Sequence, residues 1–257
     1  MSDNQFYTKK EFLPELGSTT SLVTCILLAL FFVLSLYFRN PSRNRNDPIV
    51  MRKRINRVLA YSVFCLVFFY FFIPNSNYKL NVYLKLIGIP SLGFDLITQC
   101  FYPLLLTMIL FLGPLLMYIF DEEDKFTFNF DLEFFRDIVV GPSVEEICFR
   151  AVICPLLFFG GYHIRSIIIF SPILFGFAHF HHIFPIEKDT IVRKLLIITL
   201  QLCFTSLFGM YSAFIFFRTG NLLACILTHA FCNSMGFPNF GDLPDHPKKN
   251  SNVFHIV

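Results

Sequence analysis

The chain contains 257 residues, of which 55% are hydrophobic and 36 are phenylalanine, and its mean hydropathy is +0.60. This apolar share exceeds that of a soluble globular domain, so the composition predicts an integral membrane protein. The formal charge is only +3 and the basic residues form no continuous stripe, which argues against a nucleic-acid partner. The eight cysteines show no CxxC pair and no zinc-binding spacing, and we expect them to be small buried side chains.

The first span is expected at residues 18–38, an apolar run of the length that a bilayer requires. The preceding residues are too acidic and too poor in apolar side chains for a cleaved signal peptide, so this span should act as an uncleaved signal. Residues 39–57 hold six arginines and Lys53 against one acid. Such a short basic loop should face the cytosol.

Two more spans are expected in the N-terminal half, at residues 58–73 and 96–120. Between them, residues 82–93 are moderately apolar but carry a lysine, a proline and two glycines, which indicates a short interfacial or re-entrant helix. Four acidic residues at 121–124 close the third span. Alternation from the basic loop places this acidic connector in the cytosol.

The C-terminal half begins with an amphipathic segment, residues 131–138, that leads into four further spans. These spans are expected at residues 139–159, 167–180, 195–217 and 222–236. We find no internal repeat and no separable soluble domain. The sequence therefore predicts one all-α, polytopic membrane domain over residues 1–257, with seven to eight transmembrane helices around a polar cavity that is open to the cytosol.

Three charged residues interrupt the fourth span. Glu145, Glu146 and Arg150 lie in an apolar run, where an ionised side chain at the centre of a membrane helix costs roughly 2.5 to 3.5 kcal/mol. Glu146 and Arg150 are four residues apart on one helical face and can neutralise each other. Glu145 points about 100 degrees away from that pair, which leaves its carboxylate available for chemistry.

Two further pairs of residues at helical spacing place polar groups in other spans. Phe175 and His179 are four residues apart near the cytosolic end of the fifth span. His229 and Asn233 are four residues apart on one face of the seventh span. We expect these groups to converge with Glu145 at one depth, although buried ion pairing or interhelical hydrogen bonding would explain each of them separately.

This set of side chains can activate water and stabilise an oxyanion. Apolar surroundings favour proton uptake by Glu145 and make it a usable general base, while His179 would polarise the water. His229 and Asn233 would donate to the oxygen of a tetrahedral intermediate. The same residues could instead bind zinc, although HExxH is absent, and Cys148 could be a nucleophile but is expected to be a packing residue. A transporter with a polar midplane site would use these residues as ligands.

At these positions the sequence resembles the type II CAAX prenyl endopeptidases, the Ras-converting-enzyme branch of the glutamate intramembrane proteases. Three motifs in one order carry the resemblance: EExxxR at 145–150, FxxxH at 175–179 and HxxxN at 229–233. The similarity covers about residues 135–240, which would form the catalytic core. The family fold has eight spans, where we count seven.

The resemblance implies an endoplasmic-reticulum protease that removes the last three residues of farnesylated or geranylgeranylated CAAX proteins such as Ras-like small GTPases. It implies that Glu145 and His179 activate water, that His229 and Asn233 form the oxyanion hole, and that no metal or other cofactor is required. Glu146, Arg150 and Phe175 would support the site. A prenyl chain inserted in the bilayer would deliver the substrate. A catalytically idle prenyl-binding protein would share the same features without cleaving its ligand.

Overall fold

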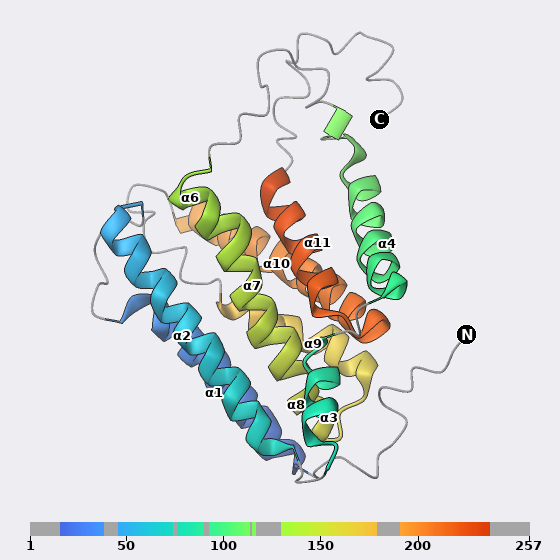
Figure 1. The fold of residues 1–257 in the computed structure, drawn as a ribbon. Helices are drawn as coiled ribbons and strands as arrows, with labels where there is room; N and C mark the ends of the chain where they lie inside the picture. The colour runs from blue at the N-terminus through green and yellow to red at the C-terminus, as the bar shows by residue number, and fades with distance from the viewer. Residues whose placement is uncertain are drawn as a thin grey trace, which may run out of the picture.

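The computed structural model describes residues 16–38, 46–73, 77–89, 93–113, 115–116, 130–178 and 191–236. Within these ranges the regular structure is helical and contains no strand, as the sequence predicts. Helices α1 and α2 lie side by side, and the segment from α6 to α8 runs next to them (Figure 1). On the other side of that segment, α11 packs against α4 and α10.

The first two helices are α1, Ser18–Tyr37, and α2, Pro48–Phe72. The prediction that the basic loop extends to Arg57 was wrong, because α2 begins ten residues before the expected second span. Asp47 caps α2: its Oδ1 accepts hydrogen bonds from the backbone N–H groups of Ile49 and Val50. Proline at the first helical position is also a normal start signal, so most of the predicted loop is the first three turns of a helix.

Two shorter helices follow, α3 at Lys79–Leu86 and α4 at Phe94–Leu110. The first confirms a short helix close to the expected residues 82–93. Gly88, just after α3, adopts a positive φ of 78°, and its carbonyl oxygen accepts a 2.8 Å hydrogen bond from the N–H of Leu222. This contact joins the turn after α3 to the start of α11.

The central segment is one uninterrupted helical run in which α-helical and π-helical stretches alternate. Its parts are α6 (Leu132–Phe134), η2 (Phe135–Val140), α7 (Gly141–Glu146), η3 (Ile147–Ile153) and α8 (Cys154–Phe159). Each π-helical stretch ends two residues before a proline: η2 ends before Pro142, and η3 ends before Pro155. Proline has no N–H to donate, which favours a locally widened turn. The predicted lead-in and fourth span therefore form a single element.

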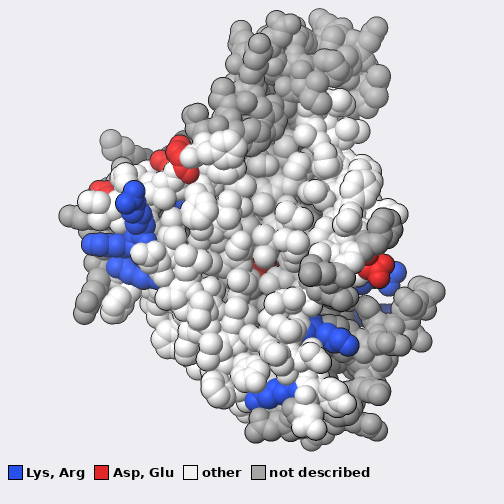
Figure 2. All heavy atoms as spheres, in the orientation of Figure 1, with Lys and Arg blue, Asp and Glu red and all other residues white. Residues whose placement is uncertain are grey.

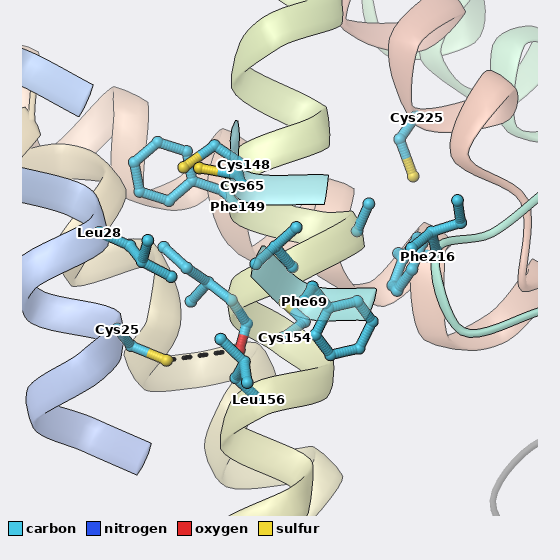
Figure 3. Packing of buried hydrophobic residues seen from close by; sticks show 14 of the residues in the cluster. Cys25, Leu28, Cys65, Phe69, Cys148, Phe149, Cys154, Leu156, Phe216 and Cys225 are labelled. Carbon is cyan, nitrogen blue, oxygen red and sulfur yellow. Dashed lines mark hydrogen bonds between the residues drawn. The ribbon is translucent and has the colours of Figure 1, made fainter. Parts of the chain in front are cut away.

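The C-terminal helices are α9 (Ile164–Ala178), α10 (Ile191–Thr219) and α11 (Leu222–Met235). Buried apolar side chains of α1, α2, the central segment and α10 form one core, and Figure 3 shows part of it. Five of the eight cysteines are buried, which confirms most of that expectation: Cys25, Cys65, Cys148, Cys154 and Cys225.

Among the described residues, three helices are long and apolar enough to cross a membrane: Ser18–Tyr37, Pro48–Phe72 and Thr199–Thr219. Shorter apolar helices accompany them, at Asp95–Leu110, Ile164–Leu174 and Leu222–Met235. Many large apolar side chains on these helices are exposed, for example Leu110 and Phe71. An apolar exterior of this kind is what a lipid environment requires. The chain is therefore a membrane protein, and its described part is all-helical.

Candidate active site

A buried ion pair lies at the centre of the site. Glu146 in α7 and Arg150 in η3 have side chains that are 0% and 2% exposed, and Nε of Arg150 lies 3.1 Å from Oε2 of Glu146. The guanidinium also donates through Nη2 to the carbonyl oxygen of Gly209 in α10, at 3.3 Å. The predicted Glu146–Arg150 pair is confirmed, and each buried charge has the partner that its burial demands.

Two more side chains complete the surroundings of the Glu146 carboxylate. Oγ of Ser212, in α10, donates to Oε2 at 2.7 Å, and Nδ1 of His229, in α11, lies 2.8 Å from Oε1. Both oxygens of Glu146 are thus satisfied by partners from three different elements. Ser212 was not among the predicted site residues, and the sequence does not single it out, because α10 also contains Gln201, Thr205 and Ser206.

His229 also reaches the second carboxylate. Its Nε2 lies 3.7 Å from Oε2 of Glu145, whose side chain is 20% exposed. The helical turn separates Glu145 from the Glu146–Arg150 pair as expected, yet the imidazole of His229 lies between the two carboxylates. The site therefore contains one fully buried carboxylate and one partly exposed carboxylate, joined by a single histidine.

Aromatic packing fixes the imidazole from another side. The ring of Phe208, in α10, lies 4.5 Å from the His229 ring, measured between centroids. The guanidinium carbon of Arg150 is 6.0 Å from the centre of the same phenyl ring. Such packing, together with the hydrogen bond to Glu146, leaves the imidazole little rotational freedom.

Asn233 lies one turn after His229 on α11, as its spacing predicts. Its Nδ2 donates a 2.9 Å hydrogen bond to the backbone carbonyl oxygen of Asp137 in η2, and its side chain is exposed. The seventh predicted span thus contacts the central segment at two levels, through His229 and through Asn233.

Two predicted site residues are not tested by the structure. His179 lies outside the described residues, and the side chain of Phe175 in α9 does as well. Their proposed roles stay predictions. Cys148 is fully buried in the core, as expected of a packing residue. Among the described residues no group of three histidine, cysteine or acidic side chains is arranged to hold a metal ion, but the zinc alternative also uses His179 and stays open.

The site lies beneath an uncharged surface. Figure 2 shows a face without basic or acidic atoms over most of its area, apart from a small acidic spot near its middle, over α7. The basic side chains lie at the left edge and in the lower part of this view. A polar centre enclosed by apolar helices marks an intramembrane functional site.

Comparison with known proteins decides the family. A model of the type II CAAX prenyl endopeptidase Rce1-like family matches residues 127–235, the range from before α6 to the end of α11. CAAX prenyl protease 2 of Arabidopsis thaliana is 32% identical over 87% of this chain and 81% of its own length. The human protein of that name is 31% identical over 92% and 76%, and the probable CAAX prenyl protease 2 of Schizosaccharomyces pombe is 34% identical over 82% and 80%.

The chain belongs to the type II CAAX prenyl endopeptidase family. The matched region contains every residue of the predicted site, from Glu145 to Asn233. No solved structure matches the chain. Within this family member, the described geometry supplies a buried carboxylate, a partly exposed carboxylate and a histidine between them.

Proposed function

We propose that this CAAX prenyl endopeptidase cleaves the peptide bond after the prenylated cysteine, releases the C-terminal tripeptide and uses Glu145 to activate the attacking water. The observation that carries the proposal is the position of His229, between the partly exposed Glu145 and the buried Glu146. Two carboxylates in such different surroundings are suited to different roles. Glu146 holds the site together, and Glu145 takes part in the reaction.

Glu145 acts as the general base. Its carboxylate takes a proton from water, and the oxygen of that water attacks the carbonyl carbon of the scissile bond. The proton then passes to the amide nitrogen as the carbon–nitrogen bond breaks, so no covalent enzyme intermediate forms. His179 assists by holding the water, and Phe175 is a supporting residue.

His229 and Asn233 stabilise the negative oxygen of the tetrahedral intermediate. A carboxylate only accepts hydrogen bonds, so Nδ1 of His229 carries a hydrogen toward Glu146. The proposed role also requires a hydrogen on Nε2, which lies 3.7 Å from Oε2 of Glu145. Nε2 and the amide of Asn233 then offer two donors from one face of α11.

The substrates are farnesylated or geranylgeranylated CAAX proteins, including Ras-like small GTPases. Their prenyl chain lies in the bilayer and enters through the apolar face, while the peptide reaches the site from the cytosol. The protein crosses the endoplasmic-reticulum membrane seven to eight times with its polar cavity open to the cytosol. This topology is supported by the basic residues around the start of α2, including Arg52 and Lys53.

Cleavage of a prenylated CAAX peptide by the purified protein tests the proposal. The unprenylated peptide is the substrate control, and wild type is compared with Glu145→Gln, with and without a chelator. We expect wild type to release the tripeptide from the prenylated peptide only, Glu145→Gln to abolish release, and the chelator to have little effect.

Other outcomes identify the alternatives. Activity that is lost with the chelator and restored by zinc would support a metalloprotease that uses the same residues. A wild-type protein that binds the prenylated peptide without cutting it, or that transports a solute across vesicles, would overturn the proposed protease chemistry. Full activity of Glu145→Gln would overturn the assignment of the base.

A further inference from the structure

The backbone of the central segment leaves one carbonyl group without its usual helical donor. In an α-helix the N–H of Gly141 would bond to the carbonyl oxygen of Asp137, four residues earlier. Here the Gly141 N–H donates to Arg136, five residues earlier, because η2 is π-helical. The next residue is Pro142, which has no N–H. The Asp137 carbonyl therefore receives no hydrogen bond from residue 141, as it would in an α-helix. It also receives none from residue 142, as it would in a π-helix.

The side chain of Asn233 occupies this acceptor. Its Nδ2 lies 2.9 Å from the Asp137 oxygen, across 96 residues of sequence. A buried or half-buried carbonyl without a partner is unfavourable, so this acceptor is a strong anchor for any donor that reaches it. The amide nitrogen carries two hydrogens, and the bond to Asp137 uses one of them.

We propose that Pro142 is a positioning residue for the oxyanion hole. Because proline has no backbone N–H, the Asp137 carbonyl remains free to accept the hydrogen bond from Asn233. Fixing one N–H of the amide also fixes the direction of the other, which is the donor that meets the substrate. This inference rests on the role of Asn233 in the proposed function. It adds a residue of the central segment, near Glu145 in sequence, that acts on catalysis through α11.

The arrangement couples the two halves of the site. Pro142 is two positions from Val144 and three from Glu145, in the same helix α7, while Asn233 lies on α11 with His229. The missing backbone hydrogen bond before Pro142 thus helps to set the distance between α7, which carries Glu145, and α11, which carries His229 and Asn233. A regular helix at this point would present no carbonyl for Asn233 to bind.

Replacing Pro142 by a residue with an N–H tests the inference. Pro142→Ala and Pro142→Ser restore a donor that competes with Asn233 for the Asp137 carbonyl. We expect kcat for the prenylated peptide to fall roughly tenfold to a hundredfold, with KM little changed, because the donor is misplaced while substrate binding is retained. Thermal stability should be unchanged or higher, since a helix interior tolerates alanine better than proline.

A double-mutant cycle shows whether the effect passes through Asn233. Asn233→Ala alone should lower kcat by about a hundredfold or more, and Pro142→Ala should then cause no further loss. Pro155→Ala is the matched control: it adds an N–H at the corresponding position after the other π-helical stretch, in α8, and should leave kcat unchanged. Activity of Glu145→Gln reports separately on the proposed function.

Three results would overturn the inference while the proposed function stands. The first is full kcat in both folded Pro142 variants. The second is an equal loss on adding Pro142→Ala to wild type and to Asn233→Ala, which would place the effect elsewhere. The third is failure of both variants to fold, which would show that the proline serves folding instead.

Discussion

Nδ1 of His229 lies 2.8 Å from Oε1 of Glu146, although 83 positions separate the two residues in the chain. The second oxygen of Glu146 is taken by Arg150 and Ser212, so this one carboxylate joins α7, η3, α10 and α11. Its burial makes the junction rigid, since a fully buried charge cannot exchange its partners for water. Glu146 therefore determines where His229 stands relative to Glu145.

Glu146→Gln is expected to lower both stability and activity. Removing the negative charge leaves the buried guanidinium of Arg150 uncompensated, and breaking a buried pair in this way costs about 3–5 kcal/mol. The amide also presents a different hydrogen-bonding pattern to His229. Thermal unfolding in detergent and cleavage of a prenylated peptide measure the two effects.

Glu145→Gln is the matched comparison for this substitution, because it makes the same chemical change one residue away. Its side chain is 20% exposed and 3.7 Å from His229, so little stability should be lost while cleavage is abolished. Equal unfolding temperatures for the two variants would contradict the division between a structural and a reacting carboxylate.

Ser212→Ala should reduce catalysis through Glu146. A hydrogen bond to a charged group contributes about 1.5–3 kcal/mol, and its loss leaves Oε2 with Arg150 as its partner among the described residues. We expect a lower unfolding temperature and a reduced kcat, with Ser212→Thr retaining more of both. Steady-state kinetics with the prenylated peptide provides the measurement.

Ser62→Ala is the control for Ser212→Ala. Ser62 is 3% exposed in α2 and donates to the Leu59 carbonyl, so it is a similarly buried serine whose hydrogen bond stays within its own helix. Comparable losses of kcat in the two alanine variants would mean that burial of a serine, and not its bond to Glu146, is what matters.

Local spacing was enough to predict several of these relationships. The Glu146–Arg150 pair follows from the four-residue repeat of a helix, and His229 with Asn233 follows from the same rule. The helices themselves follow from long apolar runs. The start of α2 could also have been predicted, because Asp47 before Pro48 is a helix start signal. The many arginines in this stretch led instead to the prediction of a loop.

Contacts between distant elements could not be predicted in the same way. Nothing in the sequence near Ser212 indicates that its hydroxyl meets Glu146, because that contact depends on how α10 packs against the central segment. The two π-helical stretches could not be predicted either. Pro142 and Pro155 indicate an irregular helix, but the sequence does not distinguish a kink from a widened turn. The place of His229 between the carboxylates depends on all of these features.

Asn221→Ala should destabilise the start of α11. Oδ1 of Asn221 accepts hydrogen bonds from the N–H groups of Leu223 and Ala224, so the side chain caps the helix that carries His229. Loss of such a cap costs about 1 kcal/mol. Asn221→Ser, which can still cap, should have an unfolding temperature closer to wild type. The prediction fails if serine and alanine are equally destabilising.

Gly88→Ala should destabilise the protein and lower activity together, through the junction of α3 with α11. Gly88 has a φ of +78°, and a Cβ there would lie 2.7 Å from the ring of Phe216 and 2.8 Å from the backbone nitrogen of Leu222. That nitrogen is the one that donates to the Gly88 carbonyl, so relieving the clash displaces the first residue of α11. Peptide cleavage and thermal unfolding report the two losses.

Gly161→Ala separates the clash from backbone strain. Gly161 has a similar φ of +81°, but a Cβ there would meet nothing within 4 Å. Both variants bear the cost of a left-handed alanine, roughly 1–2 kcal/mol, so the difference between them measures the contact with α11. We expect Gly161→Ala to keep its kcat. If both substitutions lower kcat equally, the close approach of Gly88 to Leu222 does not position the helix that carries His229 and Asn233.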